Sequence, residues 1–95
     1  MMQRSNTPAE AKRALFYLSP EVTRDQWLKI LMAYKAAGGD SETAETWSRQ
    51  DSRPAPHGFN PRSFRSAWDS IRLNGRITAG TLFYLAKQRG WNPSR

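Results

Sequence analysis

The chain contains no cysteine, a single histidine and no long apolar run. Without cysteine it has neither disulfide bonds nor thiolate ligands for a metal. A zinc site needs several protein ligands, so the lone His57, in a segment rich in proline and glycine, is expected to be solvated and to bind no metal. No segment approaches the roughly 20 apolar residues that cross a bilayer, and the N-terminal residues lack the apolar core of a signal peptide. We therefore expect a soluble cytoplasmic protein with no membrane contact.

Acidic residues are scarce in the second half of the chain. Up to Ser48 the six basic residues are balanced by six acidic ones, whereas from Arg49 onward nine basic residues face only Asp51 and Asp69. The formal net charge of +7 therefore arises entirely in the second half. Such a distribution favours a polyanionic partner such as nucleic acid, although a basic charge can also serve solubility alone.

The composition is that of a folded protein, since 38% of the 95 residues are hydrophobic and 12% are aromatic. A chain of this length forms one domain with one modest core. We expect a monomer in which residues 8–92 form the domain, while residues 1–7 and 93–95 are flexible ends.

Helix signals recur along this domain, and no segment shows the two-residue alternation of a strand. Pro8 and Pro61 stand where a first helical residue is expected, with Asn60 as the cap before Pro61. Thr23 and Ser41 are the expected caps of two further helices. The expected fold is all-α, a single compact bundle of about five short helices that span residues 8–18, 24–37, 42–50, 61–72 and 79–89.

Three of the four tryptophans lie on the apolar faces of these expected helices. Because an aromatic residue at helical spacing is more often core than contact surface, Trp27, Trp47 and Trp68 are expected in the core. Trp91 follows Gly90, the expected C-cap of the last helix, and is able to fold back on its final turn. The sequence leaves the place of Trp91 open.

Positive charge gathers on one flank of the expected fourth helix. Plotted at about 100° per residue, Arg62, Arg65 and Arg72 share one side of this helix with Asp69. Basic residues interleaved with aromatic ones suit single-stranded nucleic acid, where a cation follows the backbone and an exposed ring stacks on a base. Because most of the rings are expected in the core, the charges are the better candidates for contact.

No set of residues offers a catalytic constellation. Glu42 and Glu45 share a helix surface at the spacing of an ordinary solvated face, and nothing supplies the second carboxylate cluster of a two-metal site. We therefore expect no catalytic residues, no cofactor and no enzyme activity in this chain.

The segment ITAGT, residues 77–81, invites comparison with phosphate-binding loops. It lacks the glycine-rich signature that ends in Lys-Ser or Lys-Thr, so its glycine is a weak signal. Thr78 is expected to cap the last helix and Gly80 to permit close packing in its first turn. Anion binding at this helix start, helped by Arg76, is the alternative.

Four short motifs occur in an order and spacing that resemble a known family. They are Trp27 in an apolar helix that ends in Gly38-Gly39, the triplets Trp47-Ser48-Arg49 and Trp68-Asp69-Ser70, and the run from Ile77 to Lys87. Across about residues 10–92 the chain resembles the primase C-terminal domain of the second type. This small α-helical family is attached to replication primases and primase-helicases of bacteriophages, plasmids and integrated elements. The resemblance implies an accessory module near a primer-synthesising catalytic domain, and not the polymerase itself.

The resemblance and the charge together predict a non-catalytic domain that helps a DNA primase hold single-stranded or template DNA for primer initiation. If about five cations bind a single strand, the logarithm of the affinity should fall with the logarithm of the salt concentration at a slope of about −3.5. One alternative is a docking module that links primase to helicase or to its own catalytic domain; another is a sequence-specific helix-turn-helix regulator. The expected DNA-contacting residues are Arg49, Arg53, Arg62, Arg65, Arg72, Arg76, Lys87 and Arg89.

Overall fold

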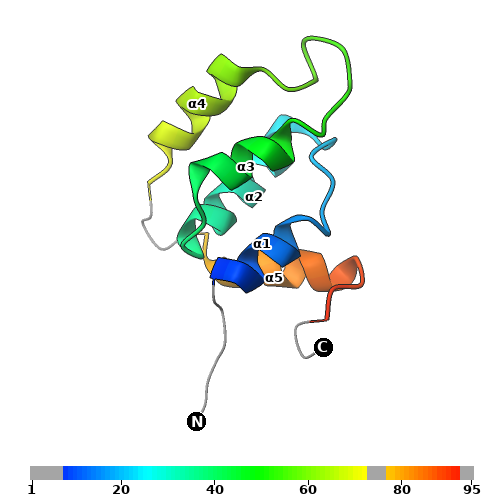
Figure 1. Cartoon of the computed structure of the whole chain (residues 1–95), viewed down its shortest axis with the longest axis vertical. Coiled ribbons are helices and arrows are strands. Elements are labelled where there is room, and N and C mark those ends of the chain that lie inside the picture. The colour runs from blue at the N-terminus through cyan, green and yellow to red at the C-terminus, as the bar shows by residue number, and fades with distance from the viewer. Residues whose placement is uncertain (1–7, 73–76, 93–95) are drawn as a thin grey trace.

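The computed structural model describes residues 8–72 and 77–92, and its secondary structure is helical (Figure 1). The helices are α1 (Pro8–Leu15), α2 (Arg24–Ala36), α3 (Ser41–Ser48), α4 (Pro61–Ser70) and α5 (Ala79–Gln88). No strand occurs in these two described ranges, so the all-α prediction is confirmed. The expected flexible ends, residues 1–7 and 93–95, lie outside the described residues.

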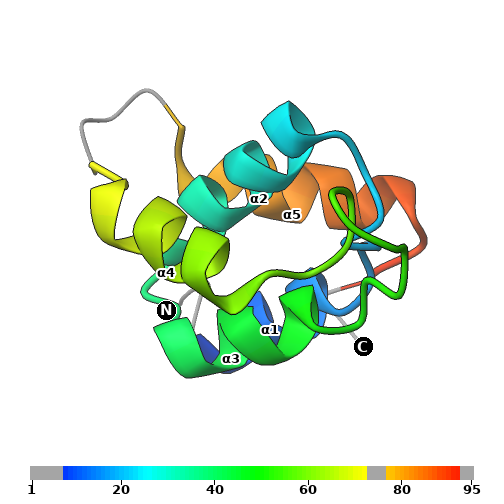
Figure 2. The same ribbon diagram turned by 90° about the horizontal axis from the view of Figure 1, so that it is seen from above.

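Helix α2 is the centre of the bundle and packs against each of the other four helices. Helices α1 and α5 pack on each other and on α2 at one end of the long axis of the molecule (Figure 1). Helices α3 and α4 pack on each other and on α2 toward the opposite end, and the view from above shows α4 set apart from α1 and α5 (Figure 2). The bundle therefore has two parts that share α2.

Side-chain caps fix where three of the helices begin. The Thr23 hydroxyl accepts a hydrogen bond from the Gln26 amide, and the Asn60 side chain accepts one from the Ser63 amide, as predicted. The prediction of Ser41 as the α3 cap is wrong, because Asp40 accepts from the Thr43 amide at 2.8 Å. A carboxylate is a stronger partner than a hydroxyl for the positive end of a helix.

Three helices end two or three residues earlier than the sequence predicts. After Leu15 the chain continues in two tighter turns, in which the amides of Tyr17 and Leu18 donate to carbonyls three residues back. Helix α3 ends at Ser48, where the predicted helix extended to residue 50. Helix α4 ends at Ser70, because Ile71 has an extended backbone with ψ of 129°.

The core joins both parts of the bundle. Trp47 and Trp68 are buried in it as predicted, and the Trp47 indole donates to the Leu18 carbonyl at 2.8 Å. Trp91 is also buried, stacked on Phe83 with ring centroids 5.1 Å apart. Gly90, with φ of 102°, ends α5 in the left-handed conformation and lets the chain fold back.

The start of α5 differs in detail from the prediction. Thr78 occupies the cap position, but its side chain makes no capping hydrogen bond. A Cβ atom added to Gly80 would meet only the Thr78 hydroxyl, at 3.4 Å, so this glycine serves no close packing. Arg76, the expected helper for anion binding, lies outside the described residues.

Within the described part of the chain, no helix has the length and apolarity needed to span a membrane.

Candidate nucleic-acid interface

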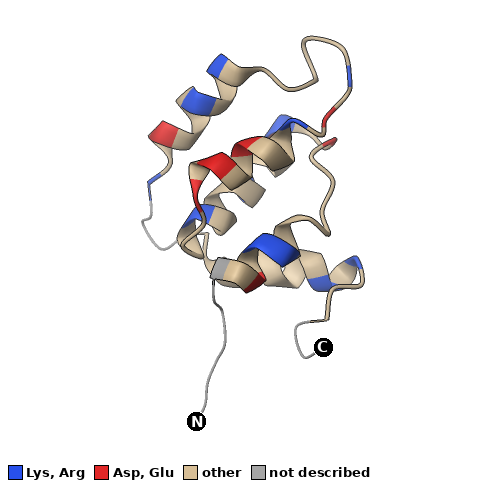
Figure 3. Cartoon of the chain, in the orientation of Figure 1, with Lys and Arg blue, Asp and Glu red and all other residues tan. Residues whose placement is uncertain are grey.

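Helix α4 presents two uncommitted arginines. Arg62 and Arg65 are exposed, and among the described residues neither forms an ion pair or donates a side-chain hydrogen bond. Figure 3 shows basic bands along α4, with Asp69 on its last turn. An arginine that is exposed and unpaired keeps all its donors for an external anion. These two residues are therefore the strongest candidates for phosphate contact.

Arg72 does not lie on α4, which corrects the prediction of three arginines on one side of this helix. The helix ends at Ser70 and the chain turns into an extended conformation at Ile71. Arg72 is nevertheless exposed and close in sequence to the end of α4, with no partner among residues 8–72 and 77–92. It can still contact a nucleic-acid strand that extends past the end of α4.

Arg49 is held against its own helix and a loop ring. Its guanidinium pairs with the Glu45 carboxylate at 2.7 Å, an exposed pair one helical turn apart. The same guanidinium lies 4.7 Å from the centre of the Phe59 ring. Because exposed ion pairs are weak, Arg49 remains available to a phosphate that competes with Glu45.

Arg53 is engaged inside the protein. Its guanidinium donates to both oxygens of the largely buried Asp51 carboxylate, at 3.0 and 2.7 Å, and also to the Val22 carbonyl. The Ser52 amide and hydroxyl donate to Glu21. These contacts attach the start of the 51–60 loop to the segment before α2, so Arg53 positions this loop.

The hydrogen bonds from Arg53 hold the pKa of Asp51 below its usual value. This carboxylate therefore stabilises the fold above its unfolded pKa of about 3.9, and the contribution is lost as the pH falls toward the lower folded value. We expect Asp51→Asn to lower the melting temperature at pH 7, with a difference from wild type that shrinks below about pH 4. Thermal unfolding followed by circular dichroism across pH 3 to 7 measures this difference. A difference that stays constant over this range would contradict the role of the charged pair.

Lys87 and Arg89 belong to a different part of the surface. Both are exposed at the end of α5, which packs against α1 and α2. Helix α5 lies at the end of the molecule away from α4 (Figure 1), and Figure 3 shows the chain's basic residues in that orientation. The predicted contact residues that the structure describes therefore do not form one patch: Arg49, Arg53, Arg62 and Arg65 lie around α4 and the loop before it, and Lys87 and Arg89 lie at the end of α5.

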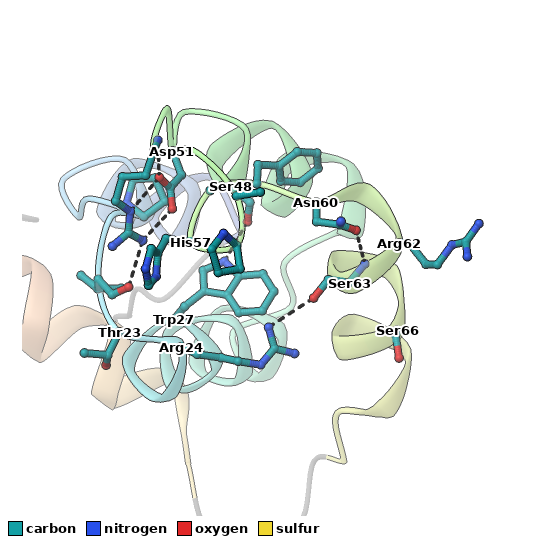
Figure 4. A pocket seen from close by; sticks show the side chains of 17 residues that line it. Thr23, Arg24, Trp27, Ser48, Asp51, His57, Asn60, Arg62, Ser63 and Ser66 are labelled. Carbon is teal, nitrogen blue, oxygen red and sulfur yellow. Dashed lines mark hydrogen bonds and ion pairs between the residues drawn. The ribbon is translucent and has the colours of Figure 1, made fainter.

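An open cavity of about 1040 Å³ lies between the start of α2, the loop before α4 and the first turns of α4 (Figure 4). Its apolar wall includes Val22, Trp27, Pro56 and Phe59. Its charged lining consists of three arginines and Asp51, with His57 in addition. Because Arg53 already neutralises Asp51, the positive charge of Arg24 and Arg62 is unbalanced there.

Trp27 packs against the core but also forms part of this wall, so its assignment to the core is only partly confirmed. The side chain is only half-buried, and Figure 4 shows it in the middle of the cavity-lining residues. Its indole donates to the buried Ser48 hydroxyl at 3.1 Å, which fixes the ring. The Arg24 guanidinium lies 5.3 Å from the ring centre and donates to the Ser63 hydroxyl on α4.

The sequence missed this cavity and the part that Arg24 takes in it. Arg24 belongs to the electrically neutral half of the chain, so the charge distribution does not indicate it as a binding residue. The only local signal was an arginine three residues before Trp27, a spacing that brings two side chains together on a helix.

No group of three or more His, Asp or Glu side chains within the described ranges is arranged to hold a metal ion.

The fold and the exposed cations together define a small all-α domain with a basic face on α4 and an adjoining cavity. The chain matches the family Primase C terminal 2 (PriCT-2) over residues 11–86. Because the match covers most of the chain, this protein belongs to the PriCT-2 family and is a primase-associated C-terminal domain, which confirms the resemblance found in the sequence. No curated protein and no solved structure gives a significant match.

Proposed function

We propose that this domain is a non-catalytic module that binds single-stranded template DNA beside a primase catalytic domain. The observation that carries the proposal is the pair Arg62 and Arg65, exposed on α4 and without a partner among the described residues. Two cations one turn apart on a helix can contact successive phosphates of a strand. Membership of the PriCT-2 family supports a setting in which template DNA is present.

The arginines differ in what they contribute. Arg62, Arg65 and Arg72 supply contacts to phosphates, which give affinity without sequence preference. Arg53 acts indirectly, because its bonds to Asp51 and Val22 hold the loop before α4. Arg49 contacts the strand when a phosphate displaces Glu45 from its guanidinium. The exposed pair Lys87 and Arg89 belongs to the end of α5, in the other part of the bundle, so it is available to another anion.

Binding to a short labelled single strand, measured by fluorescence anisotropy across a salt series, tests the proposal. Each phosphate contact on a single strand contributes about −0.7 to the slope of log affinity against log salt. Three contacts predict a slope of about −2, and five predict about −3.5. Absence of binding at low salt, or an affinity that does not change with salt, would refute the proposal.

A second candidate function, docking to a primase catalytic domain or helicase, is favoured by aromatic side chains at the surface. Tyr17, just after the end of α1, is 50% exposed, and Tyr84 on α5 is 62% exposed. Exposed aromatic residues are enriched in protein interfaces. Titration with a purified catalytic or helicase segment separates the two functions, because docking alone predicts protein binding without DNA binding.

A further inference from the structure

We propose that the cavity between α2 and α4 holds one unstacked nucleotide of the bound strand, with its base against Trp27 and its phosphate at Arg24. This inference rests on the proposed function, since it describes how the same single strand of DNA would be bound. The cavity volume of about 1040 Å³ lies at the upper end of the range of ligand sites, about 300 to 1,000 Å³. It is therefore large enough for one nucleotide whose base is no longer stacked on its neighbours in the strand.

The chemistry of the walls fits a nucleotide. A base needs a flat apolar surface, which Trp27 and Phe59 supply, and a phosphate needs a cation close to that surface. Arg24 provides the cation beside the Trp27 ring and Arg62 a second cation at the edge of the cavity, and the one carboxylate of the lining, Asp51, is already paired with Arg53. A purely apolar guest would leave this positive charge without a partner.

Arg24 is in a position to change partners. In the free protein its guanidinium contacts the face of the Trp27 ring and the Ser63 hydroxyl at 3.2 Å, and neither of these carries a negative charge. A phosphate is a stronger partner for a guanidinium than a hydroxyl is. When Arg24 turns to the phosphate, the face of the Trp27 ring becomes free for the base.

The ring that receives the base is already fixed. The Trp27 indole is held by Ser48, and its ring packs edge-on against Phe64 of the core, with centroids 6.4 Å apart. Stacking on a fixed ring costs little conformational entropy. The positive ends of α2 and α4 both face the cavity, because their caps Thr23 and Asn60 line it.

The cavity also continues into the basic flank of α4. Arg62 lines the cavity and extends outward from α4, away from Trp27, in Figure 4. Arg65 follows one turn later and is exposed. A strand with one nucleotide in the cavity would thus bring its neighbouring phosphates to Arg62 and Arg65.

The test compares a short thymidine strand with an abasic strand of the same length, which has the same phosphates and no bases. We expect the full chain to bind the thymidine strand at least about fivefold more tightly, the lower end of what one stacked base contributes. Trp27→Leu should abolish this preference and leave the affinity for the abasic strand unchanged. Thermal unfolding verifies that each variant is folded at the assay temperature.

Two further variants keep the test independent of the stability of Trp27→Leu. Arg24→Gln should weaken binding of both strands about fivefold at 0.1 M salt, whereas its charge-matched control Lys29→Gln, exposed on the same helix, should not. Gly58→Ala should remove the preference for bases, because its Cβ would lie 1.8 Å from the Arg53 carbonyl and force the loop wall to move.

The outcomes separate this inference from the proposed function. Equal binding of both strands, or a preference for bases that survives in Trp27→Leu, overturns the nucleotide cavity and leaves phosphate binding intact. Failure of both strands to bind overturns both proposals. Saturable binding of free thymidine monophosphate, without a preference for the thymidine strand over the abasic strand, assigns the cavity to a free nucleotide. It overturns the proposal that the cavity holds a nucleotide of a bound strand. Trp27-dependent binding of a primase catalytic segment, again without strand preference, assigns it to a protein.

Discussion

Trp47→Ala is expected to lower the free energy of unfolding by about 3 to 5 kcal/mol, the usual cost of removing a buried aromatic side chain. Trp47 is fully buried, and its indole is the donor for the Leu18 carbonyl. Loss of that donor leaves a buried carbonyl without its partner, at a further cost of about 1 to 3 kcal/mol. Domains of this kind are stable by only about 5 to 15 kcal/mol, so the variant should be at the edge of unfolding.

Urea unfolding followed by far-ultraviolet circular dichroism measures this loss without relying on tryptophan fluorescence. Trp47→Phe is the matched variant, because it keeps an aromatic ring in the core while it lacks the indole donor. It should be destabilised much less than Trp47→Ala. A loss below about 1 kcal/mol for the alanine variant, the range of a surface substitution, would contradict the core position of this ring.

The helices could be predicted from the sequence because their signals are local. Pro8, the Thr23 cap and the Asn60-Pro61 start all act within one helical turn. The apolar stripe of α2 is broad, and that breadth reflects a helix that contacts every other helix. The early end of α1 was not predictable in this way, because Leu18, beyond that end, is buried and so continues the apolar pattern of the helix.

The cavity could not be predicted, because it depends on contacts between distant residues. Arg53 reaches the Val22 carbonyl and Arg24 reaches Ser63, across 31 and 39 positions in the chain. A charge count treats Arg53 as one more free cation, although its partner is only two residues away. The part of Trp27 that faces the cavity was not predictable for a related reason, since a helical apolar stripe does not distinguish a core wall from a cavity wall.

Replacing Arg62, Arg65 and Arg72 together with glutamine is expected to remove most of the binding to single-stranded DNA. Three lost phosphate contacts reduce the slope of log affinity against log salt by about 2, which at 0.1 M salt corresponds to about a 100-fold loss of affinity. The three residues are exposed and unpaired among the described residues, so the fold should be unaffected, within about 0.5 kcal/mol. Anisotropy titrations at several salt concentrations give both the affinity and the slope.

The matched control removes the same charge from elsewhere on the surface. Lys12, Arg13 and Lys29 are exposed on α1 and α2, and their replacement with glutamine lowers the net charge by the same three units. If Arg62, Arg65 and Arg72 contact phosphates, this control keeps the wild-type slope, because the slope reports the number of contacts and not the total charge. Equal losses in both triple variants would mean that the strand responds only to the overall positive charge, and that α4 has no positioned contacts. Retention of wild-type affinity by the α4 variant would instead move the interface to another face, with Lys87 and Arg89 the next residues to replace.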